Sequence, residues 1–210
     1  SYDSSVPAGS PVRTHMPLAL DAWERVLSDD VTVKVHVVWG GTGSGVTAST
    51  QVNLRPMSYT AVRTDLINDA APYESTLTSQ LPVYLDFKDY CYIPNGWDPN
   101  WVSSSLRVPQ ANALALGLSR GPGWASYDMV VRFNDTADFW DFDPSDGVTA
   151  SKVDFYSTAQ HEVAHGLGFY SAVDVVDFHL DQGTTDLIHA SPMDLFRTPL
   201  GEVASAGFYY

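Results

Sequence analysis

The stretch His161-Glu162-Val163-Ala164-His165 has the spacing H-E-x-x-H, and the interpretation of the whole chain depends on it. On a helix, residues four positions apart lie on one face with Cβ atoms about 5–6 Å apart, so His161 and His165 can bind one zinc ion. Glu162 is offset by one position, which lets its carboxylate reach a metal-activated water without becoming a ligand. The alternative is two surface histidines beside a solvated glutamate. The motif therefore predicts the active-site helix of a zinc-dependent hydrolase.

The residues after the motif constrain the third zinc ligand. Gly168 follows His165 by three positions, where a glycine can adopt the left-handed conformation that ends the helix and turns the chain back toward the metal. In the pattern H-E-x-x-H-x-x-G-x-x-H the next ligand would lie at Ser171, and serine is a poor zinc ligand. We therefore expect a displaced carboxylate, and Asp174 is the first candidate. The alternatives are Asp177, His179, Asp186 and His189.

Two segments together resemble a known family. The run from 161 to 174 reads H-E-V-A-H-G-L-G-F-Y-S-A-V-D, and residues 192–197 read P-M-D-L-F-R. They are similar to the H-E-I-G-H-A-L-G-F, S-G-V-D and L-D-L-F-R elements of a group of secreted bacterial and fungal zinc metalloproteases, which are metzincin-like zincins. Weaker similarity extends through most of the chain from about residue 31, in segments 58–63, 113–118 and 140–144.

The resemblance implies an α+β fold of the zincin type, in which a twisted mixed sheet backs the active-site helix and a smaller, irregular subdomain follows. It implies that His161, His165 and Asp174 hold one catalytic Zn²⁺ and that Glu162 is the general base. Met193 follows Pro192 on an expected turn. It is interpreted either as the counterpart of the metzincin methionine turn beneath the metal or as an ordinary core methionine.

A second resemblance is shorter. Gly183-Thr184-Thr185-Asp186 is similar to the G-T-x-D element of the aspzincins, fungal secreted proteases in which a downstream aspartate completes an H-E-x-x-H site. The tyrosine and glycine that this family has next are replaced by His189 and Ala190. This resemblance makes Asp186 the second candidate for the third ligand.

Composition and charge agree with an exported, single-domain enzyme. The 210 residues fit one catalytic domain, divided into an extended arm at 1–17, an upper half at about 18–168 and a lower half at about 169–210. The formal charge of −14 argues against nucleic-acid binding, because phosphate contacts need a basic surface. No apolar run approaches the roughly 18 residues of a membrane span. We expect a secreted monomer that acts on peptide or protein substrates.

Local patterns predict the elements around the motif. Strands are expected at 31–39, 46–54, 82–87 and 129–133, and helices at 18–27, 59–71 and 110–118. The glycine-rich loop at 40–45 has no lysine and no G-K-[ST] ending, so a hairpin connection is favoured over a phosphate-binding loop.

Three other features have a structural explanation. The acidic residues around Pro144 resemble a calcium loop, but their spacing fails and a turn is favoured over Ca²⁺; they are Asp138, Asp141, Asp143 and Asp146. Cys91 is the single cysteine, which excludes an intrachain disulfide and favours a buried, inert thiol. Tyr170 is near enough in sequence to stabilise an oxyanion, although a packing role is favoured.

Two other function classes stay open. The chain could be a zinc-binding module without catalysis, against which the intact Glu162 argues, since only hydrolysis requires it. It could also be a secreted, β-rich carbohydrate-binding protein with an accidental motif, because 12 % aromatic residues and six tryptophans suit a sugar-contacting surface.

Overall fold

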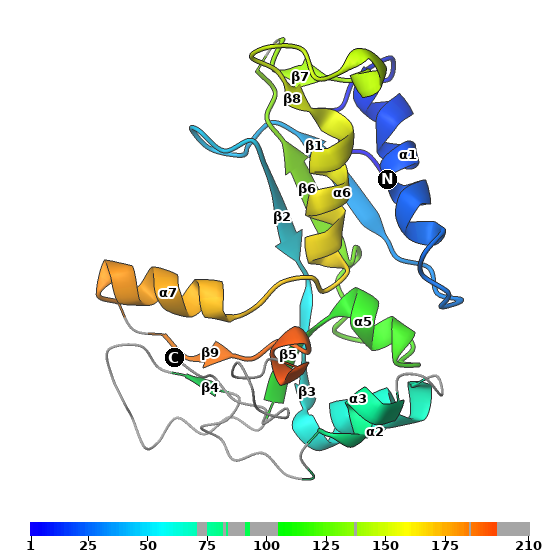
Figure 1. The fold of residues 1–210 in the computed structure, drawn as a ribbon, viewed down its shortest axis with the longest axis vertical. Helices are drawn as coiled ribbons and strands as arrows, with labels where there is room; N and C mark the ends of the chain where they lie inside the picture. Colours follow the sequence, from blue (N-terminus) through cyan, green and yellow to red (C-terminus); the bar gives the residue numbers. More distant parts are fainter. Residues whose placement is uncertain are drawn as a thin grey trace. The chain divides into compact units, whose positions relative to one another are not determined.

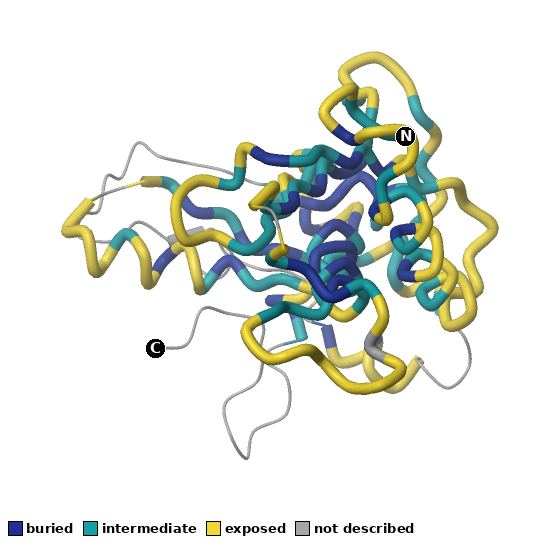
Figure 2. Tube along the Cα trace, turned by 90° about the horizontal axis from the view of Figure 1, so that it is seen from above, coloured by how far each residue is buried: buried dark blue, intermediate teal, exposed yellow. Residues whose placement is uncertain are grey.

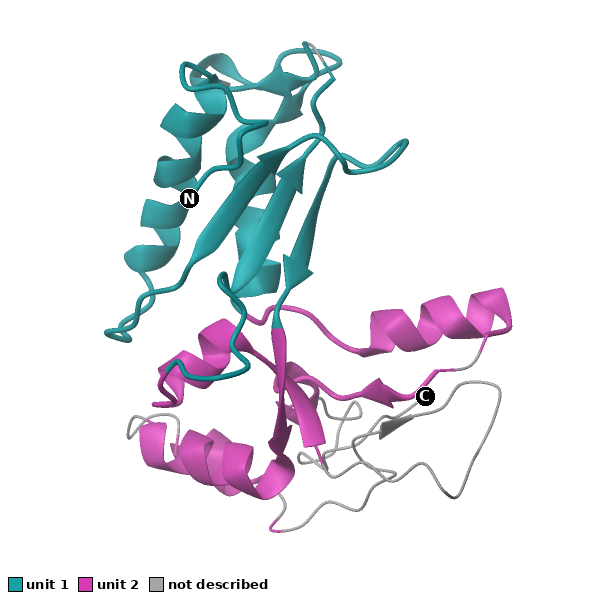
Figure 3. Cartoon of the chain, turned by 180° about the vertical axis from the view of Figure 1, so that it is seen from behind, with its two compact units in different colours: residues 1–53, 120–167 teal, residues 54–119, 168–210 magenta. Residues whose placement is uncertain are grey.

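A computed structural model of the chain describes residues 1–70, 75–81, 83, 91–92, 105–136, 138–184 and 186–196. The chain forms two compact units: unit 1 comprises residues 1–53 and 120–167, and unit 2 comprises residues 54–119 and 168–210 (Figure 3). This division differs from the expected upper half at 18–168, because residues 54–119 cluster with the C-terminal segment. Both units mix helices and strands, which confirms the α+β class. Within the described part, no helix is long and apolar enough to cross a membrane.

Unit 1 is built on a three-stranded sheet with the order β1-β6-β2, in which β1 is parallel and β2 antiparallel to the central β6. The longest helices of this unit are α1 and α6, and α6 contacts β2, β6 and α1 (Figure 1). A mixed sheet therefore backs the helix that carries the motif. The elements of unit 1 are α1 (Pro11–Glu24), β1 (Val35–Trp39), β2 (Ala48–Val52), β6 (Met129–Phe133), β7 (Trp140–Asp141), the 3₁₀ helix η1 (Pro144–Asp146), β8 (Val153–Asp154) and α6 (Phe155–Gly166).

The core of unit 1 lies between the sheet and α6. Strand β6 alternates, and the side chains on its inner face, Met129, Val131 and Phe133, are fully buried. Alternate residues of a strand point to the same face, so these three side chains form one apolar surface. The matching stripe on α6 recurs every four residues and consists of Phe155, Ala159 and Val163. Figure 2 shows this buried interior in dark blue.

The predicted hairpin between the first two strands is wrong. Strands β1 and β2 do not pair with each other, because β6 lies between them and pairs with both. Local alternation identifies a strand but not its partner, and here the partner of β1 comes from 94 residues later in the chain. Positive φ angles at Gly40, Gly41, Gly43 and Gly45 (74° to 97°) allow the loop to pass from one edge of the sheet to the other.

The expected extended arm at residues 1–17 is correct only in its first part. Asp3 N–H donates to Val37 O at 2.8 Å, so the first residues lie alongside β1. Helix α1 begins at Pro11, because a proline in the first helical turn costs no hydrogen bond. The helix continues through Pro17 even though proline disfavours a helix interior, since Met16 and Ala19 are fully buried in the core.

The described part of unit 2 contains two short antiparallel pairs, β3 with β5 and β4 with β9. The helices predicted at 59–71 and 110–118 are confirmed as α2 and α5, while β3 was not expected; the strand predicted at 82–87 falls outside the described residues apart from position 83. The elements are β3 (Leu54–Ser58), α2 (Tyr59–Asp69), α3 (Ser75–Ser79), β4 (Cys91–Tyr92), β5 (Ser105–Pro109), α5 (Gln110–Ala115), α7 (Val173–Gln182), β9 (Ile188–His189) and the 3₁₀ helix η2 (Met193–Phe196). The Cys91 side chain, interpreted above as a buried thiol, lies outside the described part.

Candidate metal centre

The H-E-x-x-H motif lies on α6, as predicted. Asp154 caps the helix, because its carboxylate accepts the backbone N–H groups of Tyr156 and Ser157 at 3.1 and 3.0 Å. The helix ends at Gly166, and Gly168 has a φ of 100°, which confirms the left-handed glycine expected there. A Cβ at Gly168 would also lie 2.2 Å from Oδ1 of Asn112, so the Asn112 amide would have to move aside.

Gly166 fixes how closely the motif helix approaches the sheet. A Cβ at this position would lie 2.2 Å from Sδ and 2.9 Å from Cβ of Met129, on the central strand β6. Our sequence interpretation missed this contact, because a glycine near the end of a helical pattern is also explained by the helix terminus. The absence of a side chain at Gly166 therefore sets the distance between the sheet and the helix turn that carries His165.

The structure brings the two motif histidines together. Their Nε2 atoms are 3.0 Å apart, and the rings are nearly perpendicular, at 86°. Two nitrogens bound to one tetrahedral zinc at 2.0–2.1 Å would be about 3.3 Å apart. His161 is exposed and His165 is half-buried. The pair therefore fits one zinc ion after a shift of a few tenths of an ångström, which a rotation of either ring supplies.

Glu162 lies on the buried side of the same helix and is 7 % exposed. Thr50 Oγ1, on strand β2, is 2.7 Å from Oε2 of Glu162 and 2.8 Å from its backbone oxygen. Within the described residues, no hydrogen-bond partner is found for Oε1. One carboxylate oxygen is thus anchored to the sheet, and the other is available to a reacting water. Nothing in the local sequence pattern singles out Thr50.

The five candidates for the third ligand all belong to unit 2. Asp174 is exposed in the first turn of α7, and Asp177 is exposed one turn later. His179 bonds through Nδ1 to Thr184 Oγ1 at 2.8 Å, and its Nε2 lies 4.0 Å from Oδ2 of Asp186. Among the described residues, no group of three or more His, Cys, Asp or Glu is placed to hold a metal. The identity of the third ligand stays a prediction.

His189 differs from the other candidates in how its ring is held. Its Nδ1 donates to the backbone oxygen of Ser105 at 2.8 Å, which leaves Nε2 as the acceptor nitrogen of the neutral ring. Burial lowers the pKa of His189, so the neutral form is favoured. A ring nitrogen bonded to a backbone carbonyl is the arrangement that usually orients a metal-binding histidine.

Ser171, at the metzincin ligand position, has another role. Its hydroxyl donates to Oδ1 of Asp194 at 2.6 Å, while Oδ2 of Asp194 accepts the backbone N–H groups of Ala172 and Ser191 at 3.1 and 2.8 Å. Asp194 is 5 % exposed and joins the start of α7 to the turn of η2. Met193, in that turn, is 38 % exposed and is not a core residue.

Tyr170 and the acidic segment around Pro144 have structural partners. The Tyr170 hydroxyl donates to the backbone oxygen of Arg107 at 3.4 Å, and burial raises its pKa, which fits the favoured packing role. Asp141 accepts the backbone N–H groups of Thr149 and Asp143 at 2.7 and 3.0 Å. These bonds lower its pKa and hold the segment as a turn, which is the favoured alternative to a calcium loop.

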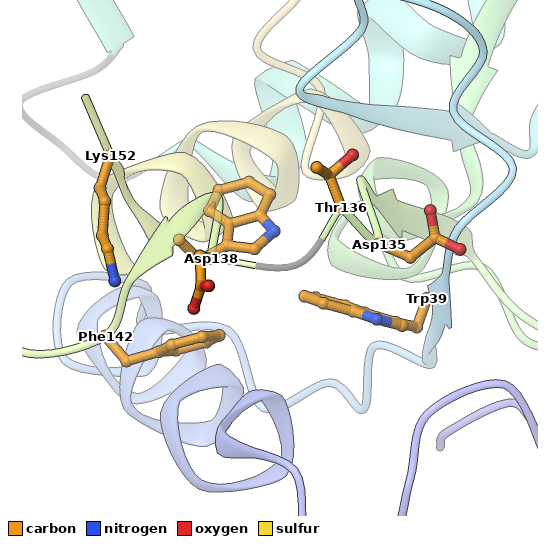
Figure 4. A pocket seen from close by; sticks show the side chains of 7 residues that line it. Trp39, Asp135, Thr136, Asp138, Phe142 and Lys152 are labelled. Atoms are coloured by element: carbon orange, nitrogen blue, oxygen red, sulfur yellow. The ribbon is translucent and has the colours of Figure 1, made fainter.

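A cavity of about 340 Å³ opens elsewhere in unit 1. The Asp138 carboxylate and the Lys152 side chain point toward a space that the rings of Trp39 and Phe142 border (Figure 4). Trp140 forms another wall, and its indole N–H already donates to Asn134 O at 2.7 Å. The cavity thus combines aromatic faces with charged groups at its edge.

Comparison with known proteins gives one match. A family model described as SPBPB7E8-like matches residues 106–203, a segment that includes the H-E-x-x-H helix and Asp174. That description names no activity. No curated protein and no solved structure matches the chain significantly.

Proposed function

We propose that the chain is a secreted, zinc-dependent endopeptidase of the zincin type that acts as a monomer. The observation that carries this proposal is the convergence of the His161 and His165 Nε2 atoms, 3.0 Å apart, on a helix whose intervening Glu162 is anchored to the sheet. The helical spacing alone brings the two rings within hydrogen-bonding distance, but an accidental H-E-x-x-H would not require an anchored glutamate.

The residues of the motif have distinct roles in the proposed reaction. His161 and His165 bind zinc, and Asp174 is proposed as the third ligand. A bound zinc ion would supply a Lewis acid and lower the pKa of a bound water toward about 7. Glu162 would accept the proton of the attacking water and deliver it to the leaving amine.

Strand β2 is the proposed docking site for the peptide. It is an edge strand within the described part of the sheet, runs antiparallel to β6 and contacts α6. An extended peptide can add to such an edge through main-chain hydrogen bonds that are largely indifferent to sequence. Acidic substrates would be repelled by the formal charge of −14, so neutral or basic peptides are the expected substrates.

The central test combines metal analysis with one conservative substitution. The purified protein should contain one zinc per chain and cleave casein, while Glu162→Gln should retain the zinc and lose cleavage. Absence of stoichiometric zinc in the wild-type protein would refute both zinc hypotheses. Zinc without cleavage in the wild type would instead support the inert zinc-binding module.

The third ligand requires separate variants. Asp174→Asn should lower zinc affinity strongly, whereas Asp177→Asn, on the same helix face of α7 but one turn later, serves as the matched control. If Asp174→Asn retains wild-type affinity, His189→Gln and Asp186→Asn are the next variants to measure. A zinc-bound structure would show which side chain lies about 2 Å from the ion.

Carbohydrate binding is a second candidate function, and the cavity beside Trp39 favours it. Aromatic faces can stack on a sugar ring, while Asp138 and Lys152 can bond its hydroxyls. Retention on cellulose, chitin or β-1,3-glucan, weakened by Asp138→Asn but not by Asp146→Asn, would support this function. If the wild-type protein is not retained on any of the three polysaccharides, carbohydrate binding is refuted.

A further inference from the structure

Thr50 ties strand β2 to the proposed general base. Its Oγ1 lies 2.7 Å from Oε2 and 2.8 Å from the backbone oxygen of Glu162, and both are ordinary distances for O–H···O bonds. The Thr50 side chain belongs to the edge strand, and Glu162 belongs to α6. The link therefore runs from the sheet to the middle of the motif.

The two bonds have a single consequence for the carboxylate. A hydroxyl has one proton, so Thr50 donates to one of the two oxygens at a time. Both acceptors belong to Glu162, so its position relative to β2 is held whichever bond forms. A glutamate side chain has several rotatable bonds, and fixing Oε2 limits where Oε1 can lie.

We propose that Thr50 is a positioning residue for Glu162. It holds the carboxylate so that Oε1 faces the reacting water in the productive orientation. The inference rests on the proposed peptidase function and deepens it, because the strand proposed to bind the peptide also fixes the proton acceptor. Substrate and base are then located by one element of the sheet.

A purely structural role predicts different results. Thr158 provides the matched control, because it is half-buried like Thr50 and lies on the same helix as Glu162, but its hydroxyl donates to Asp154 O at 2.8 Å instead of to the Glu162 carboxylate. If Thr50 only joined α6 to the sheet, Thr50→Val and Thr158→Val would both lower the free energy of unfolding, and neither would change kcat of the folded protein. Thr50→Val preserves the shape of the side chain and removes the hydroxyl, and Thr50→Ser restores the hydroxyl.

The four proteins, wild type, Thr50→Val, Thr50→Ser and Thr158→Val, are compared as full chains loaded with zinc. We expect Thr50→Val to keep one zinc, to lose about tenfold or more in kcat, and to keep KM within about twofold. Thr50→Ser should recover most of kcat, and Thr158→Val should match the wild type. Wild-type kcat in Thr50→Val, or an equal loss in Thr158→Val, would overturn the proposal.

Two readouts do not depend on turnover. Acetohydroxamate binds zinc and gives its proton to a neighbouring carboxylate, so its Kd should rise in Thr50→Val by a factor similar to the loss of kcat. The chain has only four glutamates, so carboxyl ¹³C labelling gives four signals, and Glu162→Gln identifies the one of interest. In the metal-free protein Thr50→Val should shift that signal, and an unchanged signal would refute the hydrogen bond.

The outcomes also separate this inference from the proposed function. A wild-type protein that holds zinc but cleaves no peptide refutes the peptidase, and the hydroxamate Kd then still decides the role of Thr50. A wild-type protein without zinc refutes both. An active wild type with an equally active Thr50→Val refutes only the inference on Thr50.

Discussion

Replacing Gly166 with alanine tests whether the close contact between α6 and β6 holds the motif helix in place. The new Cβ would lie 2.2 Å from Sδ, 2.4 Å from Cε and 2.9 Å from Cβ of Met129. Rotation of the Met129 side chain can remove the first two clashes, but its Cβ is fixed to the central strand. Overpacking of this kind costs about 1–3 kcal/mol, while alanine gains about 1 kcal/mol over glycine in a helix. We therefore expect the free energy of unfolding to fall by about 1 kcal/mol.

The assay is urea unfolding of Gly166→Ala in two backgrounds. Met129→Gly is destabilising by itself, because Met129 is fully buried: the lost side chain costs about 2–5 kcal/mol and a glycine in a strand about 0.5–1 kcal/mol more. In that background all three clashing atoms of Met129, its Cβ included, are absent, so adding Gly166→Ala should stabilise the protein by up to about 1 kcal/mol. Gly166→Ala should thus lower the free energy of unfolding of the wild type and raise that of the Met129 variant. An equal effect in both, or stabilisation of the wild type, would refute the reasoning.

Three further predictions concern the scaffold. Asp154→Ala removes the cap of α6 and should lower the free energy of unfolding by about 1 kcal/mol in urea titrations, whereas Asp154→Asn should lose less. Arg120→Ala leaves the fully buried Asp128 without its ion pair and should cost about 3–5 kcal/mol by the same assay; a loss below that of Asp154→Ala would contradict this. The pKa of Asp141 is lowered by its bonds to Thr149 and Asp143, so its contribution is complete above about pH 4 and is lost as the pH falls through the lowered value. Melting temperatures measured from pH 2 to 6 should therefore fall less steeply on acidification in Asp141→Asn than in the wild type.

The motif helix and the histidine pair could be predicted because their determinants are local. Spacing of four residues places His161 and His165 on one helix face whatever surrounds them, and the apolar residues at 155, 159 and 163 follow the same period. Gly168 was likewise predictable, since its left-handed conformation is a property of the helix end. The strand predicted at 129–133 is confirmed as β6.

The arrangement of the sheet could not be predicted, because strand pairing is not local. Val37 pairs with Val131, which is 94 positions away, and no pattern near either residue records this. Thr50 acquires its contact to Glu162 only through that arrangement, since β2 lies beside β6 and α6 packs against both. The helix predicted at 18–27 matches only the second part of α1 (Pro11–Glu24), because local rules count Pro17 against a helix, whereas the burial of Met16 and Ala19 outweighs that cost.

The position of Glu162 on its helix argues for a function rather than a structural role. The buried residues of α6 are Phe155, Ala159, Glu162, Val163 and Gly166, so the glutamate occupies the stripe that faces the core. An acidic side chain there is costly, and the partner found among the described residues is a hydroxyl rather than a cation. An apolar residue would stabilise this position more. A glutamate kept at this buried position beside the two histidines of the motif, at the expense of stability, is what a reaction requiring its carboxylate would select.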